Sequence, residues 1–349
     1  MGLTGLTGWK GPEMNLRVPV LCLLASLLLP LRAEAAVVVR LGTLAPSGSS
    51  WELILRRMGV EWAQATGDEL RLRIYAGGTV GDESEMIRKM RIGQLQAAAI
   101  SNAGLAEIDP GAYALMLPMM FSSYDEWDYV RKRVNPLLEA TLKEKGFVVL
   151  AWSDVGWVYF FTKSPMKSPA DLRGMKLAGS HTESRTLDIF KWAGFNPVPI
   201  STIDMMTGLQ TGLIDSLYLP IILAEGSQYY RQAPHMTELK WAPLQGAVVM
   251  HEKGWTGLTA DQKTEVLRIT AQVGEDLRAT NRDQEERSLQ AMKSRGLDVV
   301  PVSGELVNEW TETVKKAYPR VRESLVPPAI FDEVVRLRDE YRKTAAAPR

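Results

Sequence analysis

The feature that most constrains the fold is a regular alternation of short β-branched runs with amphipathic helical stretches, which begins at Ala36. An apolar run at residues 36–44 ends in turn-forming residues and is followed by a helical pattern at 51–64. Residues 70–75 (LRLRIY) alternate as a second strand, and residues 82–91 form a second helical pattern. Such an order of elements predicts an α/β fold.

Further strand-like runs follow at regular intervals, at residues 97–101, 147–153, 158–162, 175–177, 214–219 and 247–250. Helical patterns at 188–193 and 203–210 lie between them, and Gly212 stops the second of these. In open α/β sheets, ligands bind beyond the carboxyl ends of the strands. This rule predicts a pocket around residues 47–51, Asn102, Trp152, His181 and 217–219.

The first 35 residues have a different pattern. An apolar run of 14 residues at 18–31 follows Arg17 and precedes Ala33-Glu34-Ala35, the order of a secretory signal peptide. A membrane-spanning helix needs about 20 apolar residues. We therefore expect cleavage after Ala35 and a periplasmic mature protein, with Met1 and Met14 both open as the start of translation.

The single cysteine, Cys22, lies inside the expected signal peptide, so the mature chain is expected to contain no disulfide. Removing residues 1–35 takes three basic and two acidic residues from 41 of each, which leaves 38 and 39. A net charge close to zero gives no electrostatic footprint for phosphates, so no nucleic-acid partner is expected.

Motifs for catalysis or metal binding are not evident in the sequence. The three histidines, His181, His235 and His251, do not have the spacing of metal ligands, and no nucleophile elbow or phosphate loop occurs. The glycine-rich segment 77–81 lacks a phosphate-binding lysine and is interpreted as a turn. We expect a protein that is not an enzyme and has no cofactor and no metal site.

The segment 194–199 (GFNPVP), followed by 208–215 (GLQTGLID), resembles the most characteristic stretch of solute-binding proteins of TRAP transporters, the DctP-type family. Further similar segments run along nearly the whole mature chain, at residues 76–86, 117–124, 169–177 and 254–259. The resemblance implies a two-lobed fold joined by hinge strands, with a long supporting helix near the carboxyl end.

The same resemblance implies a lobe I of residues 36–155 and 247–283 and a lobe II of residues 156–246 and 284–345. It places the hinge near 152–157 and 245–248 and a small organic ligand between the lobes. The implied partners are the TRAP membrane permease subunits and a periplasmic helical-repeat protein. A protein that presents its ligand to a sensor, and an enzyme acting in the same cleft, are the other functions considered.

The sequence departs from the family where most members bind an organic acid. The arginine that usually follows the Lys176-Leu177 pair is Ala178 here, and a second arginine position is Val158. A guanidinium binds a carboxylate through two parallel hydrogen bonds, so both losses disfavour small dicarboxylates. Polar positions of the family turn are replaced by Leu217, Tyr218 and Leu219.

These replacements lead to the hypothesis of a mainly apolar or amphipathic ligand, including a lipid-like one. The residues predicted to contact it are Trp51, Asn102, Trp152, Trp157, Val158, Tyr159, Ala178, His181, Leu217, Tyr218 and Leu219. The alternative for each aromatic residue is ordinary core packing, and for His181 a solvated loop position. Arg185 keeps an organic acid open as the alternative ligand, because it follows the position of the missing clamp.

Overall fold

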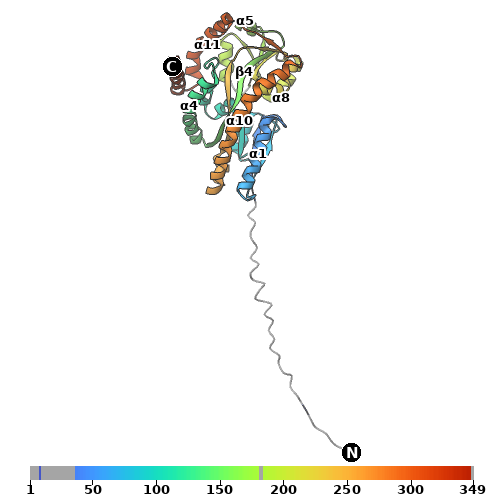
Figure 1. The fold of residues 1–349 in the computed structure, drawn as a ribbon, viewed down its shortest axis with the longest axis vertical. Coiled ribbons are helices and arrows are strands. Elements are labelled where there is room, and N and C mark those ends of the chain that lie inside the picture. The colour runs from blue at the N-terminus through green and yellow to red at the C-terminus, as the bar shows by residue number, and fades with distance from the viewer. Residues whose placement is uncertain (1–7, 9–35, 181–183, 347–349) are drawn as a thin grey trace, which may run out of the picture. The chain divides into compact units, whose positions relative to one another are not determined.

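The computed structural model describes Gly8 and residues 36–180 and 184–346 (Figure 1). The expected signal peptide and His181 lie outside these residues. From Ala36 onward the chain forms one compact unit built on a ten-stranded mixed sheet. None of the helices within the described ranges is both long and apolar enough to cross a membrane.

The sheet has the strand order β2-β1-β3-β9-β4-β7-β5-β6, with β8 paired to β4 and β10 paired to β8. Its strands are β1 (Val37–Thr43), β2 (Leu70–Tyr75), β3 (Ala97–Ser101), β4 (Phe147–Thr162), β5 (Lys176–Ser180), β6 (Asn196–Ile200), β7 (Ser216–Pro220), β8 (His235–Thr237), β9 (Ala242–His251) and β10 (Asp298–Val300). Parallel pairs join β1 to β2 and β3, and β5 to β6 and β7. Antiparallel β4 and β9 connect these two groups, so the expected α/β class is confirmed.

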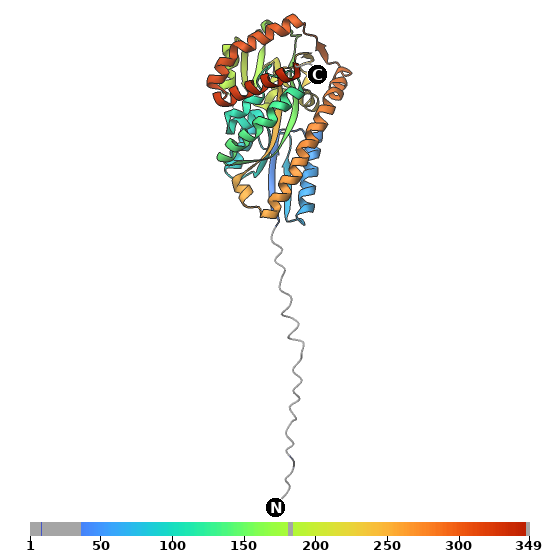
Figure 2. The ribbon, with the colours of Figure 1, turned by 60° about the vertical axis from the view of Figure 1, so that its left-hand side comes forward.

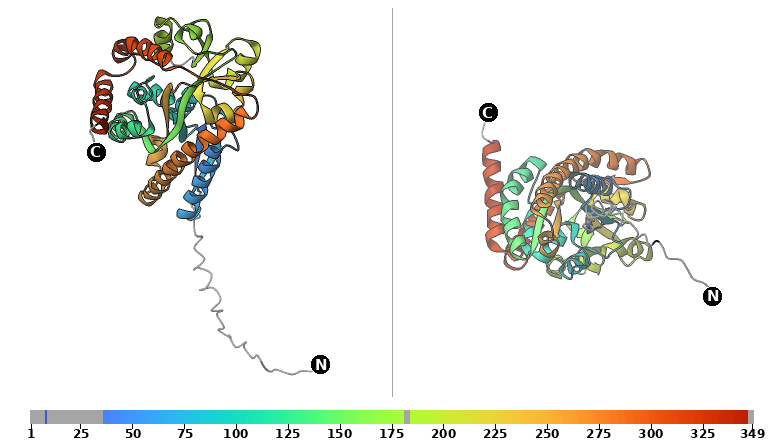
Figure 3. Two further views of the ribbon diagram at one scale, coloured as in Figure 1. Left: turned by 45° about the horizontal axis from the view of Figure 1, so that its top comes forward. Right: turned by 90° about the horizontal axis from the view of Figure 1, so that it is seen from below.

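Helices connect the strands and cover the sheet. They are α1 (Ser50–Ala65), α2 (Glu83–Arg91), α3 (Asn102–Ile108), α4 (Tyr124–Glu144), α5 (Pro169–Arg173), α6 (Ser184–Trp192), α7 (Met205–Thr211), α8 (Ile221–Gly226), α9 (Glu252–Thr256), α10 (Ala260–Lys293), α11 (Gly304–Ser324) and α12 (Pro328–Ala346), with the short 3-10 helices η3 (Pro110–Leu115), η4 (Thr202–Asp204) and η5 (Tyr229–Arg231). Figures 2 and 3 show α12 lying beside α4, and the two helices are in contact.

Strand β4 is the longest strand and pairs with β9 along most of its length. The sequence predicted two separate strands at 147–153 and 158–162, and this was wrong. The hydrogen-bonded pairing of β4 with β9 continues through the intervening residues. Two register shifts, at Val149/Ala151 and Asp154/Gly156, accommodate the extra residues of β4 as β-bulges. Gly156 has a φ of 120°, a conformation that favours glycine. The bulged stretch coincides with the hinge expected near 152–157.

Helix α10 is the expected long helix near the carboxyl end, with 34 residues. It begins at a capping box formed by Thr259 and Gln262 and packs against both α1 and β4 (Figure 1). At Gly274 a Cβ atom would lie 2.6 Å from the carbonyl oxygen of Trp152. Glycine therefore lets the helix approach the bulged part of β4 closely.

A buried ion-pair network fastens α10 and α4 to the bulge in β4. The Arg282 guanidinium donates to Asp154 Oδ2 at 2.6 Å and to both Asp128 oxygens at 2.8 and 2.9 Å. Arg131 donates to Asp128 Oδ1 at 2.7 Å and lies 3.3 Å from Asp154 Oδ1. Burial raises the pKa of Asp154, against the opposing effect of the two arginines. Three segments distant in sequence thus meet at the expected hinge.

The lobe boundaries expected from the resemblance stay a prediction. Their division points, residues 155/156 on β4 and 246/247 on β9, fall beside the second register shift. The third division point, 283/284 on α10, follows Arg282 directly.

Replacing Arg282 by methionine leaves the fully buried Asp154 carboxylate with one cation. Removing one partner of a buried ion pair leaves the other charge partly uncompensated in a poorly solvated position. We therefore expect the free energy of unfolding to fall by about 3 kcal/mol. Urea unfolding measures this loss. The matched control is Arg287→Met on the same helix, whose ion pair with Asp283 is exposed and contributes at most about 1 kcal/mol. Equal small losses for both variants would contradict the role given to the network.

Candidate functional site

A cavity of about 340 Å3 lies where the carboxyl ends of four strands converge. Thr43, Ser101, Ser180 and Pro220 are the last residues of β1, β3, β5 and β7, and all four line it. The cavity therefore occupies the position at which open α/β sheets bind ligands. Its volume lies within the range of about 300 to 1,000 Å3 usual for small-molecule pockets.

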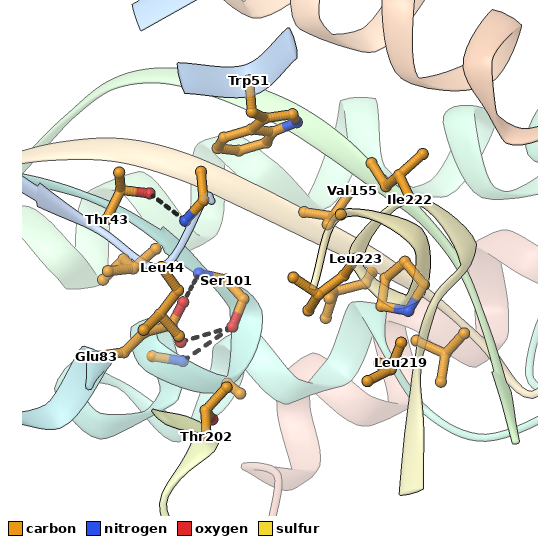
Figure 4. Close-up of a pocket in the computed structure, with 18 of the residues that line it drawn as sticks. Thr43, Leu44, Trp51, Glu83, Ser101, Val155, Thr202, Leu219, Ile222 and Leu223 are labelled. Carbon is orange, nitrogen blue, oxygen red and sulfur yellow. Dashed lines mark hydrogen bonds between the residues drawn. The ribbon is translucent and has the colours of Figure 1, made fainter. Parts of the chain in front are cut away.

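The wall of this cavity is mainly apolar. Figure 4 shows Trp51 on one side of it, and Val155, Leu219, Ile222 and Leu223 grouped on another. The remaining apolar lining residues are Leu44, Ala45, Pro46, Ala99, Ile100, Ala103, Met116, Val158, Ala178, Met205, Tyr218, Pro220 and Leu244. Hydroxyl groups are interspersed among them, from Thr43, Ser49, Ser50, Ser84, Ser101, Ser180, Thr202 and Ser288.

Glu83 is a half-buried residue whose carboxylate lies at the wall of this cavity (Figure 4). Its Oε1 accepts a hydrogen bond from the backbone NH of Ser101, and its Oε2 accepts one from the Ser101 hydroxyl, both at 2.7 Å. Burial raises the pKa of Glu83, although the bonds from Ser101 act in the opposite direction. The carboxylate thereby fixes the end of β3 at the cavity.

Asp82 connects α2 to a segment of the expected second lobe. Its Oδ1 accepts from the Glu85 backbone NH at 3.2 Å and caps α2. Its Oδ2 accepts from the Ser201 hydroxyl at 3.0 Å, and Ser201 precedes η4. Thr202, the next residue, lines the cavity. This contact therefore links the two sides of the cavity directly at its rim.

The charged groups of the cavity wall are carboxylates. Asp82, Glu83, Glu107 and Glu225 line it, whereas no arginine, lysine or histidine does so among the residues that the structure describes. Arg185 lies in α6, where its side chain is exposed, and it does not line the cavity. The described residues likewise contain no cluster of His, Cys, Asp and Glu suited to a metal ion.

Five of the predicted contact residues line this cavity. They are Trp51, Val158, Ala178, Tyr218 and Leu219. His181 follows Ser180 directly but lies outside the described residues, so the structure does not place it.

The other five predicted residues do not line the cavity. Asn102 is fully buried and its Nδ2 donates to the Ala112 carbonyl at 2.7 Å. Trp152 donates from Nε1 to Glu139 Oε1 at 2.6 Å. Trp157 and Tyr159 belong to the core beside α4, because successive residues of a strand face opposite sides and Val158 between them faces the cavity. Leu217 is fully buried in the core around β7.

Some lining residues were not predicted from the sequence. The strand-end rule pointed to Asn102, but the last strand residue, Ser101, is the one that reaches the cavity. Ile222 and Leu223 lie on α8, which begins directly after Pro220 and was not recognised as a helix. Glu83 and Gln284 lie in helices whose sequence patterns contain no signal for the cavity.

Comparisons with known proteins identify the family. The model of the family described as bacterial extracellular solute-binding protein, family 7 (DctP), matches residues 41–324. The chain is 24% identical over 270 residues to the 2,3-diketo-L-gulonate-binding periplasmic protein of Escherichia coli, covering 76% of this chain and 81% of that protein.

Solved structures share the fold. The sugar acid binding protein of Advenella mimigardefordensis in complex with galactonate has a TM-score of 0.83 and 18% identity, covering 88% of this chain and 99% of its own. A TRAP periplasmic solute-binding protein of Roseobacter denitrificans with bound β-D-glucuronate has a TM-score of 0.79 and 21% identity, covering 86% and 99%. The expected two-lobed fold is thereby confirmed, and the chain belongs to the DctP family of TRAP-type periplasmic solute-binding proteins.

Proposed function

We propose that this protein captures an organic molecule with a largely apolar body in the cavity between Trp51, Ala178 and Leu219 and delivers it to a TRAP membrane permease. The observation that carries the proposal is the lining itself, which is apolar and holds carboxylates but no cation among its described residues. The proposal includes export by the signal peptide in residues 1–35 and makes no use of catalysis.

The ligand class follows from the energetics of the wall. Burying apolar surface of a ligand against this wall stabilises the complex by about 25 cal/mol for each Å2 of apolar surface removed from water. A bound carboxylate without a cationic or well-aligned donor partner loses several kcal/mol of solvation, and nearby carboxylates such as Glu83 and Glu107 add repulsion. The described wall therefore favours an uncharged or amphipathic molecule over a small dicarboxylate.

An organic acid is the second candidate, and the comparisons favour it over an apolar ligand. The solved neighbours contain galactonate and glucuronate, both of which are sugar acids. Arg185, considered from the sequence as the acid's partner, does not line the cavity. In this chain His181, which follows the last residue of β5 in sequence, is the group proposed to hold an acid.

Delivery requires two states of the protein, one open and one closed around the ligand. The bond between Ser201 and Asp82 joins the two sides of the cavity in the structure and belongs to the closed state in our proposal. A periplasmic helical-repeat partner and a role in ligand presentation to a sensor remain predictions from the resemblance.

Native mass spectrometry of the exported, purified protein tests the ligand class. We expect a bound organic molecule that partitions into an apolar solvent after denaturation, because the wall favours an apolar body. Repeating the measurement after incubation with D-glucuronate and galactonate provides the comparison. Displacement of the co-purified molecule by either sugar acid at micromolar concentration would contradict the apolar proposal and establish the second candidate.

The variant Ala178→Arg tests whether β5 contributes to the site. Ala178 is 1% exposed and lines the cavity, so an arginine there must project into it. We expect an apolar ligand to bind at least about tenfold more weakly, because a desolvated guanidinium replaces apolar wall. Isothermal titration calorimetry with the extracted ligand measures the change.

The matched control for this variant is Ala170→Arg, an exposed position on α5. Circular dichroism shows whether both variants are folded. Unchanged affinity in a folded Ala178→Arg protein would exclude this cavity as the binding site, and tighter binding would support the organic-acid candidate.

A further inference from the structure

A second cavity, of about 810 Å3, lies on the other side of β4 from the first. Val158 lines the first cavity and Tyr159 lines the second, as expected for neighbouring residues of one strand. The remaining walls come from the segment before β9, from α11 and from α12. The residues that line the two cavities do not overlap within the described chain.

Apolar and aromatic side chains line much of this second cavity. Phe121 and Leu239 are buried there, and Met119, Tyr159, Val307 and Tyr318 complete this part of the lining. The Tyr318 hydroxyl donates to the Pro118 carbonyl at 2.7 Å. No hydrogen bond of the Tyr159 hydroxyl is found within the described chain, so this group remains available inside the cavity.

Basic side chains complete the lining. Lys240, Lys315, Arg338 and Arg342 line the cavity, and Glu238 is the one carboxylate among its described lining residues. By contrast, the charged residues found in the wall of the first cavity are acidic. The two cavities therefore differ in the sign of their lining charge.

Part of this basic lining is engaged with the protein. Arg342 Nε donates to Glu126 Oε1 at 2.5 Å and its Nη2 donates to the Met120 carbonyl at 3.2 Å. Arg338 donates to Asp339 Oδ1, and Lys315 donates to Glu312 Oε1 at 3.0 Å on the exposed face of α11. These carboxylates lie outside the cavity lining and partly neutralise the cations.

Two donor groups of this lining, the Lys240 ammonium and Arg342 Nη1, form no hydrogen bond to a carboxylate in the described ranges, although Arg342 pairs with Glu126 through Nε and the Lys240 charge acts on Glu285. Lys240 forms no ion pair there, and its Nζ lies 5.3 Å from the centroid of the Trp157 ring. Arg342 uses Nε and Nη2 in its bonds, which leaves Nη1 available. Both donors belong to one lining that also contains apolar and aromatic side chains, so an anionic group bound there has two cations to contact.

We propose that this second cavity binds an amphipathic organic anion, whose charged group contacts Lys240 and Arg342 and whose apolar body lies along Tyr159, Leu239 and Tyr318. The first cavity is not involved, so the proposal does not depend on which ligand the first cavity takes. Ligands of this class have a single anionic group on an apolar chain or ring, as in a fatty acid.

The test uses the mature chain, residues 36–349, labelled with 13C at the methionine methyl groups, and titrates it with dodecanoate below its micelle concentration. Met119 lines the second cavity, whereas Met116 and Met205 line the first, so the methyl resonances report which cavity is filled. We expect dodecanoate to shift the Met119 resonance and to leave those of Met116 and Met205 unchanged. Met119→Leu assigns the resonance.

Charge variants test the role of the basic lining. The variant Lys240→Glu should weaken dodecanoate binding, followed at the Met119 resonance, by about tenfold, and Lys316→Glu, an exposed control on α11, should not. Dodecanol, which lacks the charge, should shift the Met119 resonance with about tenfold weaker affinity than dodecanoate. The proposal is overturned if dodecanoate shifts Met116 and Met205 instead of Met119, if dodecanol shifts Met119 with equal affinity, or if Lys316→Glu weakens dodecanoate binding as much as Lys240→Glu.

Discussion

The interaction on which the rest of the structure depends is the ion pairing of Arg282 with the buried Asp154 and with Asp128. It holds the long helix α10 and helix α4 against the bulged part of β4, where the two parallel strand groups of the sheet are joined. Buried charges are tolerated when each has a partner of opposite sign, and Arg131 supplies the fourth member. Because β4 and β9 connect the two groups, this network lies at the hinge about which the lobes are expected to move.

The two cavities give the protein an unusual distribution of charge. Near the strand ends the lining is apolar with carboxylates, whereas on the other side of β4 it is aromatic with four cations. The family's sugar-acid binders are structural neighbours of this chain, yet Ala178 and Val158 bring no charge into the first cavity. A ligand that matches the first lining is chemically different from one that matches the second.

Much of the fold could be predicted from the sequence, because periodicity and caps are local properties. The strands at 70–75 and 97–101 coincide with β2 and β3, and the helical pattern at 82–91 contains α2, which Asp82 caps. The continuity of β4 could not be predicted, since a bulge depends on the partner strand β9 and on the positive φ of Gly156. The residues of the site were predicted only in part, because contacts between distant segments are not visible in a local sequence pattern. Trp51, Ala178 and Leu219 line the cavity, but Asn102 lies one residue past the strand end, and its amide satisfies a buried carbonyl that only the folded chain brings near.

The central claim is that the cavity near the strand ends takes a ligand with an apolar body and without the family's arginine clamp. A crystal structure of the exported protein, purified without added ligand, tests it most directly. The account predicts electron density in the cavity for a molecule whose apolar part contacts Trp51, Leu219 and Leu223, with no guanidinium bound to it. Density for a small dicarboxylate or sugar acid held by an arginine side chain would contradict it.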